Sequence, residues 1–128
     1  MSDPIASDPV ESDPVADAAR AVARRLTPGL VTDVEVALQA RDAAKRPDQY
    51  LDPVSLASLI VSAAALAWTV YRDLRKRTDT PSADVVTRRV RTELRRSRTI
   101  TARDDEIIAL TIEETITAIT HEDDPGQQ

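Results

Sequence analysis

The chain has 128 residues, of which 41% are hydrophobic, 30% are charged and 2% are aromatic, and its formal net charge is −5. This length allows one small domain, and its core must come from Val, Ile, Leu and Ala because the chain has no Phe. The absence of Cys excludes disulfides, thiolate metal sites and cysteine nucleophiles, and two glycines are too few for a glycine-rich phosphate loop. We therefore expect a small all-α protein that has no catalytic site, no metal site and no cofactor.

The first residues form an acidic repeat, in which SDPIA, SDPVE and SDPVA follow one another from Ser2. Three Asp-Pro pairs favour extended or turn conformations that bury little surface. No positively charged segment precedes a hydrophobic one, so the start does not have the pattern of a secretory signal. Residues 1–12 are predicted to be a disordered leader, and a docking motif repeated for avidity is the alternative.

Two short helices are expected over residues 13–46. Asp13 can cap the first helix, with Pro14 in its first turn, and this helix should end near Thr27. The spacing of Thr32 and Glu35 is that of a capping box and predicts the start of the second helix. The alternation in VTDVEVAL would also suit a strand, but a lone strand would have no partner elsewhere in the chain.

Residues 52–77 are predicted to form a long central apolar helix that begins at an Asp-Pro pair. Its charge-free part, residues 53–71, would be about 28 Å long, which is close to the ~30 Å hydrocarbon core of a bilayer. Insertion is nearly neutral in free energy because serines and a threonine offset the aliphatic residues. The side chains expected to pack against lipid or protein are Leu56, Leu59, Ile60, Ala63, Leu66, Ala67 and Val70.

The same helix allows two interpretations of where the protein resides. A stripe of small and polar residues runs along this helix and ends in a charge. It would pack against another membrane helix or, in a soluble bundle, would face water. Its members are Ser55, Ser58, Ser62, Ala65, Thr69 and Arg72. As a single span, residues 53–71 would place the protein in the inner membrane, with the basic flank keeping the C-terminal half in the cytoplasm. The alternative is a cytoplasmic protein that oligomerises through this helix.

Two blocks of opposite charge follow the apolar helix. From Arg72 to Arg103 there are eleven basic and four acidic residues, whereas from Asp104 onwards there are eight acidic residues and no Lys or Arg. Helices expected at 81–97 and 102–120 would pair these blocks in a helical hairpin over residues 80–121, with residues 122–128 as a disordered tail. The spacing of Thr101 and Asp104 is that of a capping box, although the β-branched residues of the last helix make a strand the alternative.

Basic side chains are the candidate contacts with a lipid or a partner protein. Three interpretations of these side chains are open. They could bind anionic lipid headgroups, bind an acidic partner, or form a solvated surface that is partly paired with the acidic helix. Nucleic-acid binding is disfavoured because no aromatic residue lies between Arg72 and Gln128 to stack on bases. The candidates are Arg72, Arg75, Lys76, Arg77, Arg88, Arg91 and Arg95. The candidate acid-base groups, which do not show the spacing of three metal ligands, are Asp105, Glu106, Glu113, Glu114 and His121.

Three sequence segments within residues 52–118 resemble segments of a known group of proteins. They are DPVSLASLIVSAAALAWTVYRDLRKRT, VVTRRVRTELRR and DDEIIALTIEETI. They resemble small uncharacterised bacterial proteins thought to act as accessory components of effector-based conflict systems. The resemblance implies an accessory or scaffolding role and brings no catalytic motif with it.

The sequence as a whole predicts a non-enzymatic adaptor or scaffolding protein, associated with a membrane through its central helix. Its charged helices would bind a protein partner or a second copy of the chain. The alternative is a soluble helical interaction module that oligomerises through residues 53–71, and a more remote one is a nucleic-acid-binding accessory protein.

Overall fold

The computed structural model describes residues 13–43 and 56–122. Within these ranges the chain forms five α-helices and no strand, which confirms the all-α prediction. The strand alternatives considered for VTDVEVAL and for the last helix are therefore wrong, because both segments are helical. The predictions for residues 1–12, for residues 44–55 and for residues 123–128 lie outside the described residues.

A single residue, Thr27, connects the first two helices. Helix α2 (Pro14–Leu26) begins as predicted, since the Asp13 carboxylate accepts hydrogen bonds from the N–H groups of Val15 at 3.1 Å and Ala16 at 3.3 Å. Helix α3 (Pro28–Ala43) begins directly after Thr27 and not at Thr32, so the predicted capping box lies inside the helix. Proline fits the first turn of a helix, where its missing N–H is not needed, and this explains the earlier start.

Helix α4 (Leu56–Arg75) packs against each of the other four helices. Of its predicted packing residues, Leu56 and Leu66 are partly buried, and the fully buried ones are Leu59, Ile60, Ala63, Ala67 and Val70. The apolar side chains of α4 are thus covered by other helices of the same chain.

The described helices include none that is both long and apolar enough to cross a bilayer. The predicted membrane span and inner-membrane anchor therefore find no support in the described part of the chain. The uncharged part of α4, from Leu56 to Tyr71, is about 24 Å long at 1.5 Å per residue, shorter than the hydrocarbon core. Its many alanines and two serines also lower its mean hydropathy relative to a typical span.

The serines of α4 do not face water, which corrects the expectation for a bundle. Ser58 is 4% exposed and Ser62 is 7% exposed, whereas Thr69 and Arg72 at the other end of the stripe are exposed. Residues 57–64 are all buried, so the first half of α4 is covered on every side. The hydroxyl of Ser62 has no hydrogen-bond partner in the described structure.

The last two helices carry the opposite charges. Helix α5 (Ala83–Ser97) begins two residues later than predicted, because the Ser82 hydroxyl caps it and accepts a hydrogen bond from the N–H of Asp84 at 3.1 Å. Helix α6 (Ala102–Glu122) begins with the predicted capping box. The Thr101 hydroxyl accepts from the N–H of Asp104 at 3.1 Å, and the Asp104 carboxylate accepts from the N–H of Thr101 at 3.2 Å.

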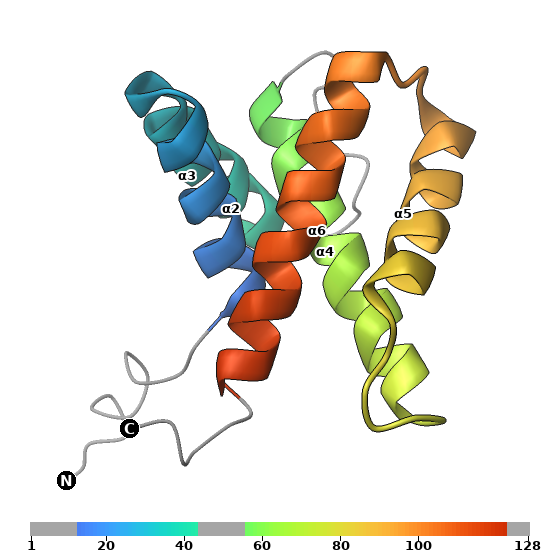
Figure 1. Ribbon diagram of the computed structural model, residues 1–128. Coiled ribbons are helices and arrows are strands. Elements are labelled where there is room, and N and C mark those ends of the chain that lie inside the picture. The colour runs from blue at the N-terminus through green and yellow to red at the C-terminus, as the bar shows by residue number, and fades with distance from the viewer. Residues whose placement is uncertain (1–12, 44–55, 123–128) are drawn as a thin grey trace, which may run out of the picture.

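Helix α6 is a second central element of the bundle. It packs against α2, α4 and α5, and Figure 1 shows it in front of α4, with α2 and α3 to one side and α5 to the other. Ile108 and Ile112 are almost completely buried in it, together with Thr111 and Thr115, whose hydroxyls donate to carbonyls one turn earlier. A hairpin of α5 and α6 alone is therefore an incomplete description, because α2 and α4 also cover α6.

A bidentate ion pair joins α2 to α3. The Arg20 guanidinium donates from Nη2 to Glu35 Oε1 at 3.1 Å and from Nε to Oε2. These hydrogen bonds lower the pKa of Glu35. A carboxyl group whose pKa is lower in the folded state adds stability above its ordinary pKa of about 4.3, and this stability is lost as the pH falls through the lower folded pKa.

The Arg20–Glu35 pair should have a small, pH-dependent effect on stability. We expect Glu35→Gln to lower the free energy of unfolding at pH 7 by up to about 1 kcal/mol, because both side chains are more than one-third exposed. The deficit should shrink as the pH falls below about 4, where Glu35 of the parent chain also becomes neutral. Urea denaturation at pH 7 and pH 3 measures this, with Asp33→Asn, an exposed position on the same helix, as the control. A deficit that is equal at both pH values would contradict an electrostatic origin.

Candidate functional site

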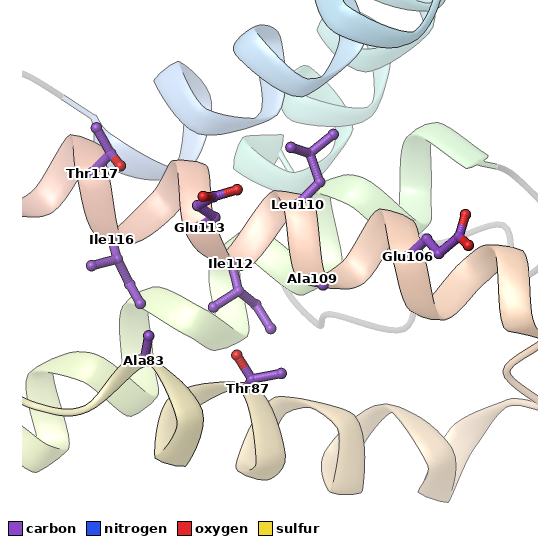
Figure 2. A pocket seen from close by; sticks show the side chains of 9 residues that line it. All are labelled: Ala83, Thr87, Glu106, Ala109, Leu110, Ile112, Glu113, Ile116 and Thr117. Carbon is purple, nitrogen blue, oxygen red and sulfur yellow. The ribbon is translucent and has the colours of Figure 1, made fainter.

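A shallow groove of about 570 Å³ runs between the first turns of α5 and the outer surface of α6. Figure 2 shows Ala83 and Thr87 rising from α5 toward Ile112 and Ile116 of α6. Small side chains on α5 leave space above the isoleucines, so the groove has an apolar floor. The groove was not predicted from the sequence, although the small side chains of Ala83 and Thr87, one turn apart, were a local indication of it.

The border of the groove on α6 is acidic. Glu106 and Glu113 line it, are exposed, and point away from α5 in Figure 2. Their seven-residue spacing places them on one face of α6, two turns apart. Neither makes an ion pair with another described residue, whereas the adjacent Glu114 pairs with Arg25 of α2 at 3.2 Å. The two free carboxylates therefore remain available to a partner.

The outer surface of α5 is basic. Arg88, Arg91 and Arg95 line a hollow of about 290 Å³, and their spacing of three and four residues puts them on one face of the helix. The face that packs inward consists of Val86, Val90 and Leu94, which are all buried. Hydrophobic packing on one side of α5 thus forces the arginines toward solvent.

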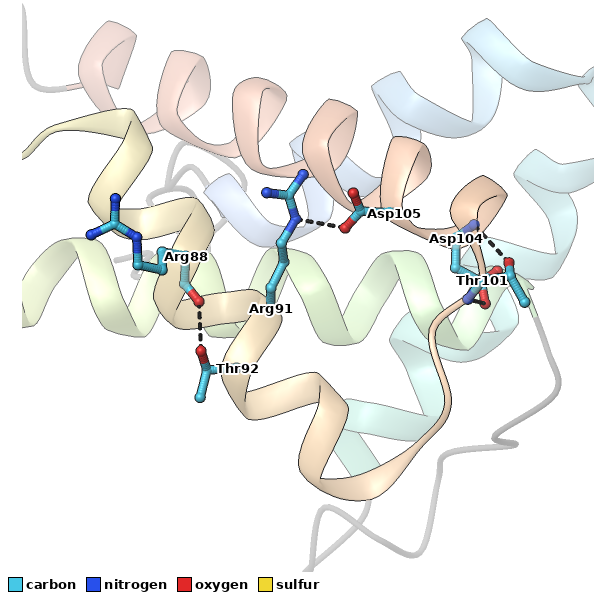
Figure 3. A network of polar contacts seen from close by, with 6 residues as sticks. All are labelled: Arg88, Arg91, Thr92, Thr101, Asp104 and Asp105. Carbon is cyan, nitrogen blue, oxygen red and sulfur yellow. Dashed lines mark hydrogen bonds and ion pairs between the residues drawn. The ribbon is translucent and has the colours of Figure 1, made fainter.

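The three arginines differ in their contacts. Arg91 is half-buried, and its Nε donates to the Asp105 carboxylate of α6 at 2.6 Å, as Figure 3 shows. Arg88 and Arg95 lie on either side of it, are exposed, and form no ion pair within the described ranges. One arginine therefore connects α5 to α6 while its two neighbours present uncompensated charge.

The apolar groove and the basic hollow are adjacent, because Thr87 lines both of them. Figure 3 shows Arg88 and Arg91 extending from α5 toward the side on which α6 lies. The surface therefore has three parallel strips: an acidic border on α6, an apolar groove, and a basic border on α5. We refer to this surface as the α5–α6 face; its charged borders are Glu106, Glu113, Arg88 and Arg95.

The other predicted basic residues lie at the end of α4 and just after it. Arg72, Arg75, Lys76 and Arg77 are all exposed. The guanidinium of Arg72 lies 5.1 Å from the centroid of the Trp68 ring, a cation–π contact that the sequence did not predict. The seven predicted lipid or partner contacts are therefore divided between the end of α4 and the outer surface of α5.

The candidate acid-base groups are mostly engaged in contacts or exposed at the surface. Asp105 binds Arg91, Glu114 binds Arg25, and His121 is exposed in the last turn of α6. Among the described residues there is no group of three or more carboxylates or histidines that could hold a metal ion. The α5–α6 face can recognise a partner through charge and apolar contact.

No family model, curated protein or solved structure matches this chain.

Proposed function

We propose that this chain is a non-enzymatic helical interaction module, an adaptor or scaffolding protein, that binds an acidic segment of a protein partner through α5. In this proposal α4 is the central apolar helix of the scaffold, and α5 and α6 form the charged hairpin. The observation that supports it is the pair of exposed guanidinium groups, Arg88 and Arg95, which form no ion pair within the described part of the chain.

The packed helix α5 fixes the separation of the Arg88 and Arg95 backbone positions. Because the opposite side of α5 is buried, Arg88 and Arg95 lie seven residues apart on a packed helix, which corresponds to about 10.5 Å along its axis. The guanidinium group is planar and donates two parallel hydrogen bonds to one carboxylate. An acidic partner helix with carboxylates two turns apart would therefore meet both arginines at once.

An acidic protein segment fits this surface better than a nucleic acid does. Single-stranded nucleic acids are usually held by aromatic side chains as well as by charge, and no aromatic residue lies between Arg72 and Gln128. An accessory role beside an effector, which the resemblance implies, would place the acidic segment on such a partner.

Binding of an acidic helical peptide tests the proposal. The probe is a fluorescein-labelled alanine-based peptide with glutamates two turns apart, and its anisotropy is measured against the full chain. We expect saturable binding that weakens at least about tenfold, or about 1.4 kcal/mol, in the double variant Arg88→Glu/Arg95→Glu. Two exposed ion pairs of up to about 1 kcal/mol each are lost, and like charges then face each other at both positions. The peptide with glutamine in place of glutamate should bind far more weakly.

The matched control is Arg24→Glu/Arg103→Glu, which changes the net charge equally at exposed positions on α2 and α6. It should leave the affinity for the peptide nearly unchanged. Equal losses in both double variants would show that only net charge matters and would overturn the proposal. Tighter binding of an RNA or DNA oligonucleotide, lost in the Arg88→Glu/Arg95→Glu variant, would assign the surface to nucleic acid instead.

A further inference from the structure

We propose that the acidic partner of α5 is α6 of a second copy of this chain, so that the α5–α6 face is the interface of a symmetric dimer. This inference rests on the proposed function, because it names the source of the acidic segment that the arginines bind. The two copies would dock face to face about a two-fold axis that runs along the apolar groove.

The order of the strips on the surface makes it complementary to itself. Glu106 and Glu113 line the groove on its α6 side. Beyond its α5 side, Arg88 and Arg95 lie in the adjacent hollow, which shares Thr87 with the groove and also contains Asp84. A two-fold rotation about an axis along the groove exchanges the borders, so that the acidic border of each copy meets the basic border of the other. Each ion pair then occurs twice, as an isologous interface requires.

The spacing along the helices also matches. Glu106 and Glu113 are seven residues apart on α6, and Arg88 and Arg95 are seven residues apart on α5, which is about 10.5 Å in each case. The short connection between Ser97 and Ala102 makes the two helices antiparallel neighbours, and Thr87 lines the groove beside Glu113. Because Thr87 lies opposite Ile112 in Figure 2, Glu113 and Glu106 each lie about two residues, roughly 3 Å along the axis, from the heights of Arg88 and Arg95. The long arginine side chains can span this offset.

An axis along the groove preserves height, so these same pairs form between the copies: Glu113 with Arg88 and Glu106 with Arg95. The groove itself supplies the apolar centre of the interface. Leu110 and Ile116 are only partly buried within one copy, and the small side chains of Ala83 and Thr87 allow a second surface to approach closely. Charge complementarity would fix the orientation, and the apolar strip would exclude water.

Exchange of charges between the borders tests the dimer. The mass of the full chain is measured by sedimentation equilibrium over a range of concentrations. We expect Glu113→Arg and Arg88→Glu each to weaken the dimer at least tenfold, because each places like charges opposite one another twice. The double variant Glu113→Arg/Arg88→Glu should recover the dimer, since the pair is restored with its charges exchanged.

An equimolar mixture of the Glu113→Arg and Arg88→Glu variants is the most discriminating experiment. The introduced arginine of one variant would face the introduced glutamate of the other, and the second contact would keep its original residues. The mixture should therefore form a heterodimer although neither variant dimerises alone. Both positions are exposed, and circular dichroism checks that helicity is retained. If either variant fails to fold, Glu106→Arg and Arg95→Glu form the equivalent second pair.

Two results would overturn the dimer. One is a chain that stays monomeric at every concentration, and the other is an oligomer that none of the four substitutions weakens. The acidic-peptide titration separates these failures from failure of the proposed function. A monomer that still binds the peptide through Arg88 and Arg95 retains the interaction module but takes its acidic segment from a different protein.

Discussion

Replacing Ile60 with alanine is expected to lower the free energy of unfolding by about 2–5 kcal/mol. Ile60 is completely buried on α4, the helix that packs against all four others, so the deletion leaves a cavity that no loop can close. The loss is a large part of the roughly 5–15 kcal/mol by which native domains are stable. Chemical denaturation followed by circular dichroism measures it, provided that the slope of the transition stays constant.

Two further variants calibrate this loss. Ile60→Val removes one methylene group and should cost about 0.5–1.5 kcal/mol. Val36→Ala removes aliphatic atoms from a side chain that is 61% exposed on α3, and it should change the stability by no more than about 0.5 kcal/mol. A loss at Val36 as large as the loss at Ile60 would show that α4 is not the centre of the core.

Replacing Ser62 with alanine should have the opposite sign and raise the free energy of unfolding by about 1–3 kcal/mol. The Ser62 hydroxyl is buried without a hydrogen-bond partner in the described structure, so folding removes it from water without compensation. Alanine removes the hydroxyl and is also the better helix former. The midpoint of urea denaturation should rise accordingly.

Thr92→Ala on α5 is the control for Ser62→Ala. The Thr92 hydroxyl donates to the carbonyl of Arg88 at 2.9 Å, but the site is exposed and water can replace this hydrogen bond. The variant therefore reports mainly the gain in helix propensity, about 0.5 kcal/mol. The excess gain at Ser62 then measures the cost of the buried hydroxyl. If Ser62→Ala destabilises the chain, the hydroxyl has a partner that the described structure does not contain.

Local capping chemistry was predictable from the sequence because it acts over three or four residues. Asp13 and the pair Thr101 and Asp104 occupy the positions that their spacing indicated. The same rule failed at Thr32, where Pro28 offered an earlier start that was equally compatible with helix geometry.

Burial of the α4 serines could not be predicted, because it depends on how many helices surround α4. A stripe of Ser58 and Ser62 has the spacing of a solvent-facing side, and only the arrangement of the other helices shows that this side is covered. The same limit explains why the charge-free run suggested a membrane. Apolar composition indicates that a helix needs cover, whereas the source of the cover is a property of the tertiary structure.

The candidate surface was predictable in part. The spacing of Arg88, Arg91 and Arg95 is sufficient by itself to place them on one face of a helix. That Arg91 alone is tied to Asp105 depends on the register between α5 and α6, which no local pattern sets. The groove has the same origin, because its floor combines residues from two helices.

The contact between α2 and α6 has a consequence for synthesis of the protein on the ribosome. Helix α2 is the first described helix to be translated and α6 is the last, yet they pack directly on each other. Val15 and Val22 of α2 are buried in the finished bundle, but until α6 has emerged the nascent chain cannot complete the core that covers them. The bundle therefore cannot close until α6 has emerged, and until then the apolar faces of the earlier helices lack part of their final cover. Exposed apolar surface of this kind promotes aggregation of incomplete chains.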